Sequence, residues 1–220
     1  MVHPEPMTVP AGKTTSGPLP LAASELTVRL GRQRTLGPFT FDVERAETVA
    51  LMGTNGSGKT TALRLALGLV RAERGTSRVF GRPVSPLQPP VDVGFVPDKP
   101  VFYDWDTAAG NLALLEPDRV RIDEVLRDVG LADVAGQPVK GFSRGMRQRL
   151  SIARALVRDP RLLVMDEPTI ALDTGGVAML VELVRARPEA GLATLVATHD
   201  TEFLAELDAR RVVVDAGRTQ

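Results

Sequence analysis

The sequence predicts an α/β fold. Apolar runs short enough for strands alternate with segments of helical periodicity along most of the chain. The runs at 162–165 and 192–198 contain almost no polar residues, which is typical of strands buried on both faces of a parallel sheet. With 220 residues and 43% hydrophobic content, the chain can form one domain with a sizeable core.

The N-terminal part is expected to be a flexible leader followed by antiparallel strands. Residues 1–23 are rich in Pro, Gly, Ser and Thr and show little apolar periodicity, so the folded domain is expected over residues 24–220. Residues 25–30 and 39–43 alternate apolar and polar side chains, as half-buried antiparallel strands do. Residues 48–52 have the pattern of a more buried strand. An antiparallel β subdomain is therefore predicted on the N-terminal side.

A phosphate-binding loop follows that strand. Residues 53–60 are Gly-Thr-Asn-Gly-Ser-Gly-Lys-Thr and fit the pattern G-x-x-x-x-G-K-[ST]. The glycines allow the backbone to turn its N–H groups inward, and the helix that starts near Lys59 directs its positive end at phosphate. Lys59 is expected to bind the β and γ phosphates, and Thr60 to bind Mg²⁺ through its hydroxyl oxygen. The residues expected to contact the nucleotide here are Gly53, Asn55, Gly56, Ser57, Gly58, Lys59, Thr60 and Thr61.

The chain continues with further strands and an inserted helical part. The Pro-rich run at 82–90 predicts a surface loop, and helical spacing predicts an α-helical subdomain over about residues 100–158. The predicted strands are 78–80, 91–96, 162–165, 192–198 and 211–215, and the predicted helices are 107–115, 121–129, 143–157, 177–187 and 201–207. Together with the phosphate loop, this order predicts a P-loop NTPase fold with a mixed sheet.

Two acidic residues, Asp166 and Glu167, follow the buried run at 162–165. They stand at the carboxyl end of a predicted strand, the edge at which open α/β sheets bind ligands. Asp166 is expected to complete the Mg²⁺ site opposite Thr60. Glu167 is expected to polarise a water molecule for in-line attack on the γ-phosphate. The alternative is a pair of acids that merely opens a loop.

Composition limits the other functions. The chain has 27 basic and 27 acidic residues, so no global charge favours nucleic acid, and no nucleic-acid partner is expected. There is no cysteine, and the only histidines are His3 and His199, which excludes disulfides, thiolate catalysis and multi-histidine metal sites. No run reaches the about 18–20 apolar residues of a membrane-spanning helix, and the N-terminus does not resemble a signal peptide. A cytoplasmic location is expected.

The motifs, in this order and spacing, resemble the ATP-binding subunit of ABC transporters over residues 26–217. The segment 141–150, Gly-Phe-Ser-Arg-Gly-Met-Arg-Gln-Arg-Leu, distinguishes that family from other P-loop NTPases. Its form is similar to the bacterial exporter branch of ABC-2 type, whose membrane subunits are separate chains. The segments that carry the resemblance are 53–60, 142–146, 162–168, 171–173 and His199.

The resemblance implies an ATPase that works as a pair. In the family, two ATP-binding subunits face each other head to tail, and each ATP lies between one phosphate loop and the partner's signature segment. Ser143 and Gly145 are then expected to contact the partner's γ-phosphate at a helix start, although a serine there can also be a simple N-cap. His199 matches the switch histidine that contacts the γ-phosphate and orients Glu167, and Asp173 matches the loop that connects the two sites.

This sequence departs from the family pattern at several positions. Asp98 stands where a metal-contacting glutamine is usual, so a water between it and Mg²⁺ is expected. Leu30 replaces the aromatic residue that stacks on adenine, so weak discrimination between ATP and GTP is expected. Arg144 and Met146 replace a glycine and a glutamine of the signature, which affects the expected ribose contact.

The resulting hypothesis is an ATP-binding and ATP-hydrolysing subunit that dimerises around Mg-ATP and powers a separate integral membrane permease in export. It would form a homodimer or heterodimer and lie on the inner face of the cell membrane through the permease. The aromatic segment at 102–106 would contact the permease or, equally, pack inside the helical subdomain. One alternative is a soluble ABC-type regulatory or nucleic-acid-associated ATPase without a permease, and another is a P-loop small-molecule kinase.

Overall fold

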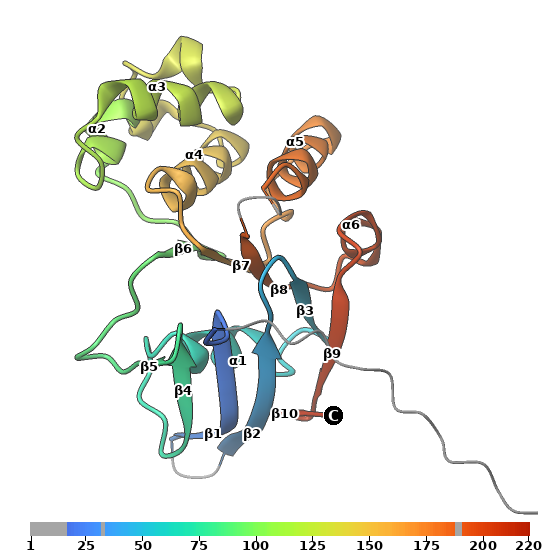
Figure 1. Cartoon of the computed structure of the whole chain (residues 1–220). Coiled ribbons are helices and arrows are strands. Elements are labelled where there is room, and N and C mark those ends of the chain that lie inside the picture. Colours follow the sequence, from blue (N-terminus) through green and yellow to red (C-terminus); the bar gives the residue numbers. More distant parts are fainter. Residues whose placement is uncertain (1–16, 32–33, 188–190) are drawn as a thin grey trace, which may run out of the picture.

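The computed structural model describes residues 17–31, 34–187 and 191–220. These residues form two sheets (Figure 1). The smaller sheet is antiparallel and contains, in spatial order, β2 (Arg34–Val43), β1 (Leu21–Leu30), β4 (Arg74–Val79) and β5 (Arg82–Pro83). The larger sheet contains β10 (Arg218–Thr219), β9 (Arg210–Asp215), β3 (Thr48–Met52), β8 (Ala193–Ala197), β7 (Leu162–Asp166) and β6 (Val93–Val96). It is mixed, because β10 is antiparallel to β9 while the other neighbours are parallel.

The uninterrupted apolar runs are explained by the position of the larger sheet between two cores. Successive side chains of a strand point to opposite faces. In β7, Leu162 and Val164 pack into the core toward the smaller sheet, whereas Leu163 and Met165 pack into the core toward the helices. Both faces are therefore dry, and a polar residue on either face would need a buried partner.

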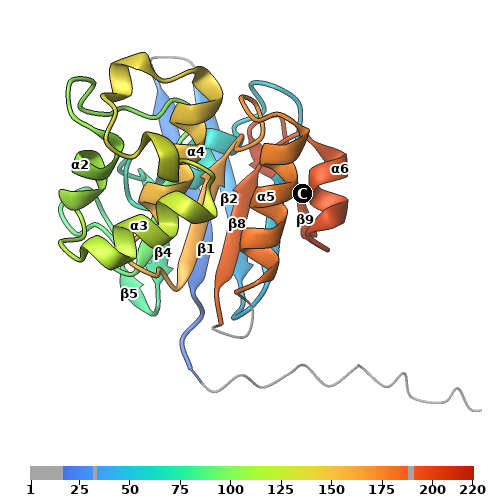
Figure 2. The same ribbon diagram turned by 90° about the horizontal axis from the view of Figure 1, so that it is seen from above.

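Helix α1 (Lys59–Ala66) fills the space between the two sheets. Its buried residues, including Leu63 and Ala66, belong to the same core as strands of both sheets. On the opposite face of the larger sheet lie α4 (Arg144–Leu156), α5 (Thr174–Arg185) and α6 (Thr201–Glu206), as Figures 1 and 2 show. This layering leaves the carboxyl ends of β3, β7 and β8 at one edge.

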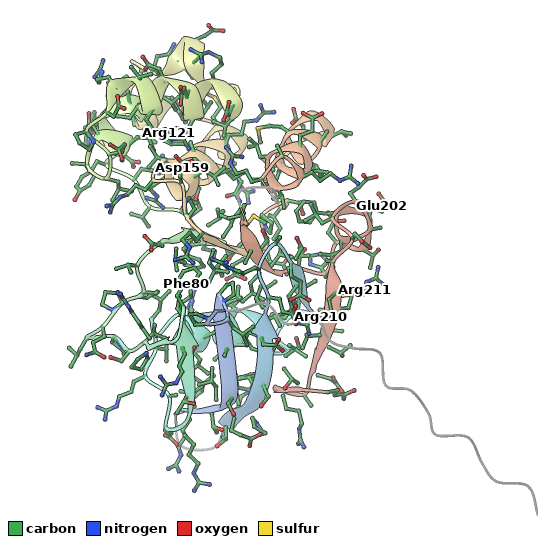
Figure 3. The ribbon with its side chains drawn as sticks, in the orientation of Figure 1. Phe80, Arg121, Asp159, Glu202, Arg210 and Arg211 are labelled. Atoms are coloured by element: carbon green, nitrogen blue, oxygen red, sulfur yellow. The ribbon has the colours of Figure 1, made fainter. Side chains whose placement is uncertain are left out.

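The helical subdomain is built from α2 (Ala108–Ala113), α3 (Arg119–Asp128) and α4, with short 3₁₀ turns at Ala132–Val134 and Val139–Gly141. The predicted apolar face of α3 is buried in the core. Arg121 joins α3 to the end of α4, because its guanidinium donates to the carbonyls of Leu156 (3.0 Å) and Val157 (3.2 Å) and pairs with Asp159 (Figure 3).

The elements differ from the sequence prediction mainly at their ends. The expected leader lies largely outside the described residues, but its last part, residues 21–23, belongs to β1. Strand β4 begins at Arg74 rather than at residue 78, and only Ser77 and Val79 of it are buried. Its sequence is mostly polar and lacks the alternation of apolar and polar residues that predicts a strand. Within the described parts of the chain, no helix is both long enough and apolar enough to cross a membrane.

Candidate active site

The phosphate loop connects β3 to α1 and depends on glycine. Gly56 and Gly58 have φ of 80° and 112°, in the left-handed region that favours glycine. A Cβ on Gly53 would lie 2.2 Å from the carbonyl oxygen of Val214 and 2.6 Å from Ser57 Oγ, so this position has no room for a side chain. No side chain caps the start of α1. The first N–H groups of the helix are therefore available to an anion.

Lys59 is held across the loop. Its Nζ donates to the carbonyl oxygens of Gly53 (2.8 Å) and Thr54 (3.3 Å). It also lies 3.4 Å from Glu167 Oε1, and the Lys59 and Glu167 side chains are only 6% and 11% exposed. The ammonium group is thus fixed at the floor of the site before any ligand arrives.

Glu167 is positioned by three side chains. Besides Lys59, Thr198 donates from Oγ1 to Glu167 Oε2 at 3.0 Å. His199 Nδ1 lies 3.2 and 3.1 Å from the two carboxylate oxygens. The backbone of Glu167 is left-handed, with φ of 47°, and its N–H donates to the carbonyl of Ala197 at 2.8 Å. A glutamate held this way, beside a phosphate loop, can accept a proton from a water molecule.

Asp166 and Thr60, which the sequence predicts as metal ligands, lie in contact with each other. Thr60 Oγ1 donates to Asp166 Oδ1 at 2.9 Å, although the two residues are far apart in sequence. Asp166 is only 1% exposed, and this burial raises the pKa of its carboxyl above the ordinary value, with the nearby Asp98 acting in the same direction and the Thr60 hydroxyl against it. A bound cation would offset the free-energy cost of burying the ionised carboxylate.

The donor set fits Mg²⁺. The residues that the structure describes contain no group of three or more histidine or acidic side chains able to cage a metal. Mg²⁺ does not need such a cage, because it usually takes one or two carboxylates and completes its shell with water and substrate phosphates. A hydroxyl and a buried carboxylate already in contact, Thr60 and Asp166, meet that requirement.

These groups surround a cleft of about 440 Å³ between the phosphate loop and the β1–β2 hairpin. The structure brings most of the sequence-predicted residues to it. The cleft is lined by Leu30, Arg34, Leu36, Asn55, Gly56, Gly58, Lys59, Thr60, Thr61, Asp98, Glu167, Ile170 and His199. Ser57 is instead buried behind the loop, where its Oγ has no hydrogen-bond partner among the described residues.

The signature residues do not line this cleft. Ser143 is the N-cap of α4 and accepts from the backbone N–H of Met146 at 3.2 Å. It remains exposed. Gly145 is half-buried, and a Cβ there would lie 3.0 Å from the carbonyl oxygen of Ala171. Within one chain, therefore, Ser143 has the N-cap role, and any nucleotide contact it makes would involve a second chain.

Two connections between α4 and the loop that follows Glu167 were not predicted from the sequence. Gln148, only 4% exposed, donates from Nε2 to the carbonyl of Pro168 at 3.0 Å, just after Glu167. Arg149 pairs with Asp173 at 3.0 Å. The pKa of Asp173 is lowered, first by the backbone N–H of Gly176 at the start of α5 and then by Arg149. In each of these two pairs the residues come from separate elements of the fold, so their spacing in the sequence does not predict the contact.

Thr198 and Arg34 are two further site residues that were not singled out from the sequence. Thr198 could have been found, because it precedes His199 at the end of a buried strand. Arg34 could have been found only by pairing it with Leu30 across a hairpin, and that register is not visible in the sequence.

Comparison with known proteins identifies relatives of this chain. A sequence profile described as ABC transporter matches residues 36–170. The chain is 32% identical over 187 residues to the SkfA peptide export ATP-binding protein SkfE of Bacillus subtilis, which covers 81% of this chain and 78% of that protein. It is 34% identical to the Nod factor export ATP-binding protein I of Ralstonia nicotianae, over 90% of this chain and 65% of the relative. A solved structure of the ATP binding subunit of an ABC transporter has a TM-score of 0.81 and 27% identity, over 90% of this chain and 87% of that one.

Proposed function

Because this chain belongs to the ABC transporter ATP-binding family, we propose that it binds Mg-ATP, dimerises around it, and couples ATP hydrolysis to export through a separate membrane permease. The arrangement of Glu167 carries the catalytic part of this proposal, since its carboxylate is held by Lys59, Thr198 and His199 at the edge of the phosphate loop. The names of the relatives, SkfE and the Nod factor protein, support export.

The reaction follows from these positions. The phosphate chain of ATP is bound by the N–H groups of the loop and by Lys59, and the base lies toward Leu30. Thr60 and Asp166 would hold Mg²⁺, with Asp98 on the same side of the cleft, and the ion would neutralise charge on the transferred phosphoryl group. Water attacks the γ-phosphorus while Glu167 accepts its proton, and the bond to the β-phosphate breaks with its electrons on ADP.

His199 acts as a positioning residue in this scheme. Its Nδ1 contacts both oxygens of Glu167, while its side chain is 55% exposed and lines the cleft. It can therefore hold the glutamate while its exposed side meets the γ-phosphate. Thr198 fixes the same carboxylate from the buried side, so the proton acceptor has one orientation.

The second chain supplies the missing half of the site. The exposed Ser143 and the half-buried Gly145 stand at the N-terminus of a 13-residue helix, where Ser143 is the N-cap and the positive end of the helix favours an anion. A second subunit would bring these residues to the γ-phosphate. ATP then drives closure only to the extent that it binds the closed pair better than the open one, and hydrolysis removes that preference.

The permease contact is supported by exposed apolar side chains on the helical subdomain. Val101, Tyr103, Trp105 and Leu114 are 78%, 69%, 79% and 61% exposed. Grooves of about 620 and 480 Å³ run between them, with Phe102 at their base. Large apolar residues gathered this way favour a protein partner, and in this proposal the partner is the membrane subunit. The subunit would then lie at the inner face of the cell membrane.

The decisive experiment uses the Glu167→Gln variant. The amide keeps the size of the side chain but cannot accept the proton, so ATP turnover is expected to fall by about 10²-fold or more. ATP-dependent dimerisation, measured by light scattering, is expected to persist or strengthen because bound ATP is no longer consumed. Unchanged turnover would exclude Glu167 as the base and with it this mechanism.

A further inference from the structure

The hairpin between β1 and β2 places an arginine beside the expected base position. Leu30 and Arg34 are directly paired across the two strands, and both line the nucleotide cleft. Directly opposite side chains of an antiparallel pair have their Cβ atoms about 4.5–5.5 Å apart. Arg34 is exposed and Leu30 is 44% exposed, so both side chains are accessible at the mouth of the cleft.

The guanidinium of Arg34 is tied to the phosphate loop. Its Nη2 donates to the carbonyl oxygen of Gly56 at 3.0 Å. A Cβ placed on Gly56 would meet nothing within 4 Å, so the space beside this anchor is open. Among the described residues, that carbonyl accepts one of the five guanidinium N–H donors of Arg34. The planar group is therefore held in place while much of it stays accessible.

The described lining of the cleft has no Phe, Tyr or Trp ring, and the imidazole of His199 is already engaged by Glu167. The apolar residues on it are Leu30, Leu36 and Ile170, none of which offers a flat surface to a base. The cleft's buried cation, Lys59, is already engaged by Glu167 and by two carbonyls of the phosphate loop. Arg34 is the other permanently charged cation in the lining, and a guanidinium stacks on aromatic faces, including those of nucleobases.

We propose that Arg34 stacks its guanidinium plane on the purine base of the bound nucleotide and so replaces the missing aromatic ring. This inference rests on the proposed ATP site. Since every base has a π face, the contact would strengthen binding of adenine and guanine nucleotides alike without selecting between them. The hydrogen bond to Gly56 sets the position of the plane relative to the phosphate loop.

The test separates a contact with the base from a contact with phosphate. Binding of ADP, GDP and inorganic tripolyphosphate, each with Mg²⁺, is measured by calorimetry for the wild-type chain and for Arg34→Ala. ADP and GDP affinity is expected to fall by about 2- to 30-fold, the range of a cation–π contact from an exposed to a desolvated site. Tripolyphosphate affinity is expected to stay unchanged, because it has no base.

Two further variants distinguish the contribution of the planar guanidinium group to ADP affinity from the contribution of its charge. Arg34→Tyr supplies a ring without charge and is expected to keep most of the ADP affinity. Arg34→Lys supplies charge without a plane and is expected to keep less of the ADP affinity than Arg34→Tyr. The matched control is Arg29→Ala, since Arg29 is an exposed arginine of β1 that pairs with Glu73 and does not line the cleft.

Three results would overturn the inference. ADP binding unaffected by Arg34→Ala would remove any role in the nucleotide site. Equal losses for ADP and tripolyphosphate would show that Arg34 contacts phosphate or shapes the loop, and full affinity in Arg34→Lys would show that charge alone matters. Failure of the proposed function looks different: the affinity for ADP would then be unchanged in Lys59→Ala.

Discussion

Lys59 Nζ lies 3.4 Å from Glu167 Oε1, and the two side chains are almost buried at the floor of the cleft. Before nucleotide binds, the cation that is to hold phosphate thus neutralises the carboxylate that is to accept a proton. An arriving γ-phosphate competes with Glu167 for the same ammonium. In the proposed mechanism, binding of ATP would therefore free the Glu167 carboxylate from Lys59, while His199 and Thr198 continue to hold it.

Removing Lys59 should weaken nucleotide binding strongly. In Lys59→Ala the phosphates lose a charge-assisted hydrogen bond, each of which contributes about 1.5–3 kcal/mol, so the Kd for ADP is expected to rise by about 10- to 100-fold. Glu167 also loses its buried partner. Calorimetric titration with ADP measures the loss. Lys99→Ala is the control, because Lys99 is exposed next to Asp98 but does not line the cleft; an equal loss there would point to a general charge effect.

Replacing Asp166 should have opposite effects on stability and on activity. Burial raises the pKa of Asp166, so the ionised form is less favourable in the folded chain than in the unfolded chain. At neutral pH this costs stability, and the cost shrinks as the pH falls through the raised folded pKa and is gone below the unfolded pKa, where both states are protonated. Asp166→Asn keeps an oxygen for the Thr60 hydroxyl and is expected to raise the melting temperature at pH 7 without nucleotide. The difference from wild type should shrink as the pH is lowered.

The same variant is expected to lose Mg²⁺-dependent turnover by about 10²-fold or more, because the metal loses its carboxylate. Differential scanning calorimetry over a pH series, together with phosphate release, measures both effects. A variant less stable than wild type at neutral pH would mean that the ionised Asp166 carries no net cost in the folded chain. The prediction on pH would then be wrong.

The sequence predicts those parts of the fold well that depend on residues close together in the chain. The phosphate loop, the acid pair after β7 and the buried strands are visible because glycine spacing and apolar runs are read along the chain. β5 and β10 were missed, since each has only two residues and is defined by its partner strand. Thr198 and Gln148 act on Glu167 and its loop from other elements, and such contacts arise only when the sheet and α4 are assembled.

Loss of the Gln148 side chain should destabilise the chain, because it removes a hydrogen bond between α4 and the loop that follows Glu167. Gln148 is buried and donates to the Pro168 carbonyl at 3.0 Å. Gln148→Leu leaves that carbonyl unpaired in a dry environment, which is expected to cost about 1–3 kcal/mol of unfolding free energy. Denaturant titration measures it. Gln137→Leu, at an exposed glutamine, is the control, and equal effects of the two changes would mean that the hydrogen bond contributes nothing.

The proposed permease contact at the two grooves around Phe102 can be tested with a substitution that does not disturb the fold. Trp105 is 79% exposed, and Lys140 Nζ lies 3.8 Å from its ring centroid. Trp105→Ala should therefore change the melting temperature and the ATPase rate of the isolated chain very little. If the groove binds the permease, the same change should remove an interface anchor and weaken co-purification with the membrane subunit, by about 10-fold or more in affinity.

The control for this prediction is Leu87→Ala, at a side chain that is 94% exposed and does not line the grooves. Equal association of both variants with the membrane subunit would exclude Trp105 as an anchor. A large fall in melting temperature for Trp105→Ala would instead assign the ring to the stability of the helical subdomain. Because the ring is mostly in solvent and its cation–π contact with Lys140 is worth only about 0.5–1 kcal/mol at an exposed site, the structure favours the interface.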